Sequence, residues 1–66
     1  MQNRIRELRA KREMTQAGLA EAVSVSSRTI ISLEKGQYNP SVILAHKIAK
    51  VFECGIEEVF IFEEGE

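Results

Sequence analysis

Two short helical patterns lie within residues 15–36, and only about three residues separate them. Each begins at a residue whose side chain caps a helix well, Thr15 for the first and Ser26 or Ser27 for the second, and Gly36 supplies a left-handed residue that ends the second. The apolar positions at helical spacing are Leu19, Ala20 and Val23 in the first pattern and Ile30 and Leu33 in the second. The segment therefore predicts two short helices, the second over about residues 26–35, joined by a tight turn.

Three further helices are predicted around this pair. A first helix covers about residues 3–13 with Asn3 as its cap, a fourth runs from its cap at Ser41 to about Phe52, and a short fifth covers residues 56–60. The fourth has the strongest periodicity, with Leu44, Ala45, Ile48, Ala49 and Phe52 on one face. The chain has 66 residues and no repeat or low-complexity tract. We therefore expect one all-α domain over residues 1–66, with a short extended C-terminal segment as an option.

Two helices joined by such a turn are the outline of a helix-turn-helix, which presents its second helix to the major groove of DNA. The candidates for reading bases are the polar residues on the outward face of that helix, Ser27, Arg28 and Ser32. Arg28 is the main candidate because a guanidinium can pair bidentately with guanine, although it could also bind a phosphate. The serine hydroxyls discriminate less sharply, because they both donate and accept. The alternative for Arg28 is a solvated charge on the helix surface.

The charges are divided unevenly along the chain, although the net charge is only −1. Residues 1–40 contain seven Lys and Arg against four Glu, whereas residues 41–66 contain two Lys against six Glu. A domain polarised in this way can meet DNA with its basic side. On charge alone, however, two sets of solvated helix faces are the favoured interpretation.

The sequence gives little support for catalysis or for a bound cofactor. The chain has one histidine, His46, and one cysteine, Cys54, and neither stands at the spacing of a catalytic triad or a metal site. We find no glycine-rich phosphate loop, no ligand-sensing segment, no signal peptide and no long apolar run. We therefore expect no enzyme activity, no cofactor, no metal, no small-molecule ligand and no membrane association, and we expect the protein in the cytoplasm.

Three segments together resemble the Cro/CI-type helix-turn-helix family, also called the phage-repressor or xenobiotic-response-element family. They are IRELRAKREMTQAGLAEAV, SVSSRTIISLEKGQYNPS and LAHKIAKVFECGIEEVF, and they cover nearly the whole chain. The resemblance implies a compact, lambda-repressor-like bundle of five short helices. It also implies a dimeric transcription regulator, most often a repressor, whose partner is double-stranded DNA.

The resemblance also implies roles for individual residues. Gln16, at the start of the second helix, resembles the residue that binds a DNA phosphate and braces the recognition helix. Residues expected near the DNA backbone are Thr29, Lys35, Gln37, Tyr38 and Asn39, although the Tyr38 ring could instead pack against the fourth helix. Arg9 and Glu34 resemble a structural ion pair between the first helix and the recognition helix. Lys11 and Arg12 either reach phosphate or are solvated.

Three positions depart from the family's usual pattern. Gly18 stands where a helix-forming residue is usual, and it should weaken the second helix by roughly 1 kcal/mol. Ser24 stands in the turn where glycine is frequent, so a positive φ there would strain it. Ile31 stands where a polar residue is usual on the outer side of the recognition helix. It could touch a thymine methyl, line a subunit contact or simply be exposed.

The C-terminal stretch holds more apolar surface than one small domain readily buries, which predicts a homodimer. The interface residues expected are Ile56, Val59, Phe60, Ile61 and Phe62. A two-fold dimer would present its recognition helices roughly 34 Å apart to a near-palindromic operator. Two alternatives remain. Val59 and Phe60 could complete the core of a monomer, and the protein could be an interaction module of the same fold, such as an antitoxin or adaptor.

Overall fold

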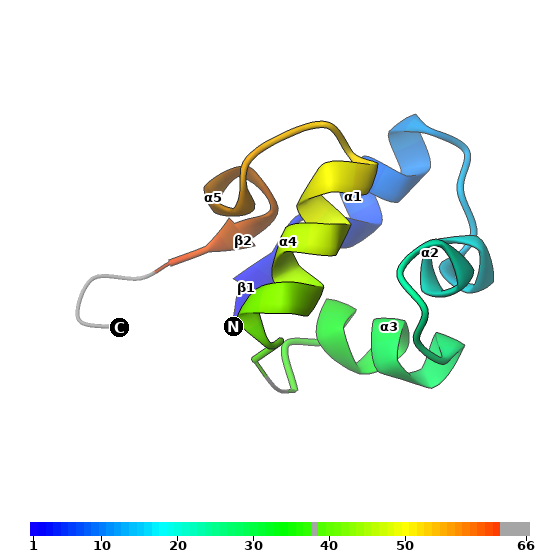
Figure 1. Ribbon diagram of the computed structural model, residues 1–66, viewed down its shortest axis with the longest axis horizontal. Helices are drawn as coiled ribbons and strands as arrows, with labels where there is room; N and C mark the ends of the chain where they lie inside the picture. The colour runs from blue at the N-terminus through cyan, green and yellow to red at the C-terminus, as the bar shows by residue number, and fades with distance from the viewer. Residues whose placement is uncertain (38, 63–66) are drawn as a thin grey trace.

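The computed structural model describes residues 1–37 and 39–62. Five helices and two short strands follow one another as β1 (Gln2–Asn3), α1 (Ile5–Lys11), α2 (Gln16–Ala22), α3 (Ser27–Glu34), α4 (Val42–Val51), α5 (Ile56–Val59) and β2 (Phe60–Ile61). Figure 1 shows α4 through the middle of the molecule, α2 and α3 at one end, and α5 with β2 at the other. The predicted five-helix bundle is confirmed, with the optional extended C-terminal segment present as β2.

Three of the helices begin at the capping residues that the sequence indicates. The Oγ1 of Thr15 accepts from the backbone N–H of Gly18, Ser26 Oγ accepts from Thr29, and Ser41 Oγ accepts from Leu44. These bonds satisfy N–H groups that have no partner within a helix. Capping side chains therefore fix where α2, α3 and α4 start.

The first four helices all end in the same turn. The residue that follows the cap has a positive φ in each case: 53° at Glu13, 60° at Ser24, 72° at Gly36 and 55° at Glu53. Its N–H and the next one bond back into the last turn of the helix, as in Ser24 N to Glu21 O and Val25 N to Ala20 O. This is the Schellman arrangement, which satisfies the last carbonyls. Only one of the four positions is occupied by glycine.

The two strands form an antiparallel ribbon that joins the start of the chain to its end, with Gln2 opposite Ile61 and Asn3 opposite Phe60. Because of this ribbon, two of the helix bounds predicted from the sequence are wrong. The first helix begins at Ile5 rather than near residue 3, because Asn3 is in β1, and the fifth ends at Val59, because Phe60 turns into β2. Asn3 still stabilises the start of α1, because its Oδ1 accepts a hydrogen bond from the N–H of Ile5.

One apolar core lies between the helices. The buried side chains are Ile5, Leu19, Ala20, Val23, Ile30, Leu33, Ala45, Ile48, Ala49, Phe52, Val59 and Phe60. Most are the positions that helical spacing indicates, and every helix contributes at least one. Leu44, which was predicted on the buried face of the fourth helix, and Leu8 of α1 pack against this core while remaining half-buried. The core therefore holds α3 by one face and leaves its other face open.

Candidate nucleic-acid interface

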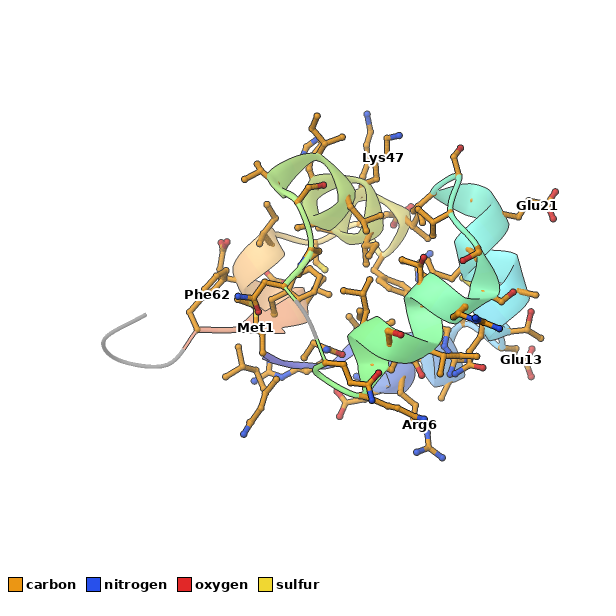
Figure 2. The ribbon with its side chains drawn as sticks, turned by 90° about the horizontal axis from the view of Figure 1, so that it is seen from below. Met1, Arg6, Glu13, Glu21, Lys47 and Phe62 are labelled. Atoms are coloured by element: carbon orange, nitrogen blue, oxygen red, sulfur yellow. The ribbon has the colours of Figure 1, made fainter. Side chains whose placement is uncertain are left out.

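The open face of α3 carries the candidate base-reading residues. Because Ile30 and Leu33 are buried, the opposite face at about 100° per residue is centred on Arg28 and Lys35, which lie two turns apart. Both are exposed, Ser32 lies half-buried between them, and Ser27 is exposed at the margin. Figure 1 shows α3 along the lower edge of the molecule, and Figure 2 looks onto it from below.

A network around Glu34 fixes α3 to the two helices that precede it. The expected ion pair is present: Arg9 Nε lies 2.6 Å from Glu34 Oε2, and Arg9 Nη2 lies 3.2 Å from Oε1. Gln16 donates from Nε2 to the same Oε1 at 3.1 Å. The side chains of Arg9 and Glu34 are only 14% and 8% exposed. One carboxylate thus ties α1 and α2 to α3, and Gln16 braces the helix as expected.

A hollow of about 490 Å³ lies where α1, α2 and α3 meet. Its lining residues are Arg6, Arg9, Thr15, Gln16, Ile31, Glu34 and Lys35. Ile31 is half-buried and forms an apolar part of its wall, so it is not the fully exposed side chain that one reading of the sequence allowed. The hollow opens beside the outward face of α3, next to the candidate base-reading residues.

The other residues expected near a DNA backbone differ in exposure and in whether their side chains already have a hydrogen-bond partner. Thr29 is half-buried, and its Oγ1 lies 3.1 Å from Ser26 Oγ at the start of α3. In the loop after α3, Gln37 and Asn39 are exposed. Tyr38 lies outside the described residues.

Arg12 is exposed, and it also makes a long-range contact that the sequence did not indicate. Its Nη2 donates to the carbonyl of Phe52 at 3.1 Å and lies 3.7 Å from Glu53 Oε2. It therefore caps the C-terminal end of α4, where a cation is favourable. No local pattern indicates this contact, since the two residues are 40 positions apart. Lys11 is likewise exposed, on α1.

Asn3 contributes a second long-range contact that sequence reasoning missed. Its Nδ2 donates to the carbonyl of Leu33 at 2.6 Å, in the last turn of α3. The backbone nitrogen of Met1 adds a bond to the carbonyl of Gly36 at 3.2 Å. The first three residues of the chain therefore hold the C-terminal end of α3 through its backbone carbonyls, in addition to the side-chain network around Glu34.

The expected subunit interface needs correction at two residues. Val59 is fully buried and Phe60 is 1% exposed within the single chain, so both complete its core and offer no surface to a partner. Ile56 and Ile61 are half-buried, and Phe62 is 56% exposed. The other large exposed apolar side chains are Val42 and Ile43, at the start of α4. The apolar surface therefore extends onto α4, where the sequence did not indicate it.

Burial also affects the one cysteine. Desolvation by the surrounding protein raises the pKa of the Cys54 thiol, and the neighbouring Glu58 raises it further. Within residues 1–37 and 39–62, no three His, Cys, Asp or Glu side chains come together as metal ligands would. None of the helices in this part of the chain is long and apolar enough to cross a membrane.

Comparison with known proteins places the arrangement of α2, turn and α3 in a recognised class. The helix-turn-helix family matches residues 5–59, and the chain therefore belongs to that family. A relative from Archaeoglobus fulgidus, described as an uncharacterised helix-turn-helix-type transcriptional regulator, is 58% identical over 66 residues, which are 100% of this chain and 93% of the relative.

Two further proteins are similar to the chain. The transcriptional repressor RstR of the cryptic phage CTXphi, from Vibrio cholerae, is 32% identical over 57 residues, which are 86% of this chain and 51% of the repressor. Among solved structures, the N-terminal DNA-binding domain of SinR from Bacillus subtilis superposes with a TM-score of 0.76 at 25% identity, over 96% of this chain and 91% of that domain.

Proposed function

We propose that this protein is a sequence-specific DNA-binding regulator of transcription that acts as a dimeric repressor on a near-palindromic operator. It acts by binding rather than by catalysis, in the cytoplasm together with its DNA target. A regulator and a repressor among its relatives, and a DNA-binding domain of the same fold, support this function. The Cro/CI-type pattern of the sequence leads to the same proposal.

The observation that carries the proposal is the way α3 is held. Its inward face is anchored in the core, its flank is tied through Glu34 to Arg9 and Gln16, and its outward face leaves Arg28 exposed. A rigid helix with a polar outward face fits the major groove, which is about 12 Å wide. In this proposal Arg28 reads a guanine, with Ser27 and Ser32 contacting neighbouring bases.

The residues around α3 are proposed to hold the DNA backbone. Lys35, Gln37 and Asn39 are exposed at the C-terminal end of α3 and just after it, and Gln16 lies beside Lys35 in the hollow. Such contacts set the register of the helix in the groove without reading sequence. Tyr38 stays a proposed backbone contact from the resemblance alone, and Thr29 a weaker one because its hydroxyl already faces Ser26.

We propose that a second copy of the chain covers the apolar surface formed by Val42, Ile43, Ile56, Ile61 and Phe62. Val42, Ile43 and Phe62 are 79%, 69% and 56% exposed. Beside them lies an apolar hollow of about 210 Å³, lined by Met1, Pro40, Val42, Ala45, Ile56, Phe60 and Phe62. Figure 2 shows Met1 and Phe62 together at this end of the molecule.

The position of this surface suits a two-fold dimer on DNA. Residues 36–41 separate the cap of α3 at Lys35 from the start of α4 at Val42, and Figure 1 shows both helices on the lower side of the molecule at this point. We propose a two-fold axis that runs perpendicular to the outward face of α3, since only that direction keeps both copies of α3 on the same side of the dimer. Two recognition helices so placed can enter successive major grooves, roughly 34 Å apart.

The test is the selection of bound duplexes from a random DNA pool by the purified protein at physiological salt. Enrichment of two inverted half-sites about one helical turn apart is the expected result. Enrichment of a single half-site would keep the DNA-binding function and overturn the dimer. No enrichment, with only weak salt-labile binding, would overturn the regulator and favour an interaction module of the same fold.

A further inference from the structure

We propose that Arg6 is a DNA-backbone contact, and that the hollow between α1, α2 and α3 seats a phosphate between Arg6 and Lys35. This inference rests on the proposed DNA-binding function. It assigns a role to a residue of α1 that neither the helix-turn-helix pattern nor the charge distribution singles out.

Most of the polar groups in the hollow are already engaged with one another. The guanidinium of Arg9 and the carboxylate of Glu34 pair at 2.6 Å, and the Gln16 amide donates to the same carboxylate. Within residues 1–37 and 39–62 the ion pairs are Arg9–Glu34 and Arg12–Glu53, so Arg6 and Lys35 have no carboxylate partner there. The hollow therefore keeps two uncompensated positive charges, which favour an anion.

These two cations come from different elements that line the hollow. Arg6 is on α1 and Lys35 is the residue that caps the end of α3, and both are exposed. Figure 2 shows Arg6 beside α3, projecting away from the body of the molecule. A volume of about 490 Å³ leaves room for a phosphate group with bound water. An exposed arginine can meet it without losing an internal contact.

The geometry of the major groove brings a phosphate to this place. When a helix lies in the groove, the two sugar-phosphate strands form the walls on either side of it. The outward face of α3 is centred on Arg28 and Lys35, and the hollow flanks that face on the side of α1. A strand at the groove wall therefore passes over Arg6.

Lys11 provides a matched control on the same helix. At about 100° per residue, Arg6 and Arg9 lie on one side of α1, and Lys11 lies on another. Lys11 is exposed and does not line the hollow. Removing its charge changes the net charge by the same amount as removing that of Arg6, so the pair separates a local contact from a general electrostatic effect.

The experiment measures the affinity of wild type, Arg6→Gln, Arg6→Lys and Lys11→Gln for the selected operator duplex and for an unrelated duplex over a range of salt concentrations. Arg6→Gln should make the negative slope of log affinity against log salt less steep by roughly 0.9, and should weaken binding to both duplexes roughly five- to tenfold at 0.1 M salt. Arg6→Lys should keep the wild-type slope, because a point charge still binds phosphate. Lys11→Gln should leave the slope unchanged.

Two results would overturn the inference while leaving the proposed function intact. One is a wild-type slope in Arg6→Gln, and the other is an equal change in Arg6→Gln and Lys11→Gln. A loss confined to the operator would instead make Arg6 a base-reading residue and would also overturn the phosphate seat. If wild type binds neither duplex, the DNA-binding function itself fails, and the wild-type measurement alone reveals it.

Discussion

Glu34 is the residue on which the position of the recognition helix depends most. It accepts from Arg9 and from Gln16 while its side chain is 8% exposed. Glu34→Ala would leave the largely buried Arg9 charge without its partner, and we expect it to lower the free energy of unfolding by about 3 to 5 kcal/mol. Urea denaturation of both proteins measures this loss.

Glu21→Ala is the control for this change, because Glu21 is an exposed carboxylate on α2. We expect it to change stability by less than about 0.5 kcal/mol. A Glu34→Ala loss as small as that of Glu21→Ala would mean that the network adds nothing to stability. Arg9 could not then be the anchor of α3.

Arg28 and Lys35 share one face of α3 but have different proposed roles. Arg28→Ala should cost roughly 1 to 3 kcal/mol of binding free energy and relax the preference at one base pair, because a bidentate contact to guanine is lost. Lys35→Ala should weaken binding to all sequences alike. Affinities for the operator and for single-base variants measure both effects. An equal loss on every duplex for Arg28→Ala would make it a phosphate contact.

Cys54 should be a slow nucleophile in the folded protein. Burial and the nearby Glu58 raise the pKa of its thiol, so the thiolate forms only at higher pH than in an unfolded chain. The rate of alkylation by iodoacetamide against pH should have its midpoint above that of the denatured protein. The stability that this protonated thiol contributes is present below the unfolded pKa and is lost as the pH rises through the folded one. A lower midpoint in the folded protein would contradict this.

At the scale of elements, the positive-φ residues that follow α1 to α4 allow a test of backbone strain. A residue other than glycine in the left-handed region costs roughly 1 to 2 kcal/mol, and Ser24 has a φ of 60°. Ser24→Gly should therefore stabilise the protein by about 1 kcal/mol after the entropy cost of glycine is included. Thermal unfolding measures the change.

Gly36→Ala is the reciprocal change at the end of α3. A Cβ at this position would lie 3.0 Å from the backbone oxygen of Met1, and the φ of 72° disfavours it as well. We expect a loss of at least 1 kcal/mol. If Ser24→Gly destabilises the protein, or Gly36→Ala does not, then these turns are not the strained elements that their φ angles indicate.

The sequence predicted helix starts better than helix ends. Thr15, Ser26 and Ser41 cap the helices expected of them, since a cap is a local signal in which the side chain bonds three residues ahead. Of the four left-handed ends only Gly36 is marked by its residue type, whereas Glu13 and Glu53 look like ordinary helix residues. Strand β1 left no signal, because two residues show no periodicity and their partners lie at the far end of the chain.

The candidate site was predicted unevenly for the same reason. The Arg9–Glu34 pair follows from the resemblance, and the exposed face of α3 follows from helical spacing. The bonds from Asn3 to Leu33 and from Arg12 to Phe52 end on backbone carbonyls, which every residue carries. No residue type marks such an acceptor, so these contacts become visible only in three dimensions.

At the scale of the whole molecule, the proposed dimer depends on the apolar surface at the start of α4. Val42 is 79% exposed, so Val42→Glu should leave the monomer fold intact and place an unpaired charge in the proposed interface. We expect the wild type to sediment as a dimer at micromolar concentration and Val42→Glu as a monomer with weaker operator binding.

Ala22→Glu is the matched control, because it adds the same charge at an exposed position on α2, at the other end of the molecule. It should sediment as wild type does. A monomeric wild type, or a dimer that Val42→Glu does not disturb, would mean that a second copy does not cover this surface.

The ribbon of β1 and β2 also sets an order of events during synthesis. Helices α2 and α3 contact each other and are made one after the other, but Gln2 and Asn3 pair with Ile61 and Phe60. The nascent chain must therefore emerge at least as far as Ile61 before β1 can pair with β2, and closing so long a loop is slow. The Asn3 side chain that holds the end of α3 belongs to that same strand. This support for the helix proposed to read DNA is thus completed only when β2 has been made, so a product truncated before β2 would keep the Glu34 network and lose the contact from a fixed β1.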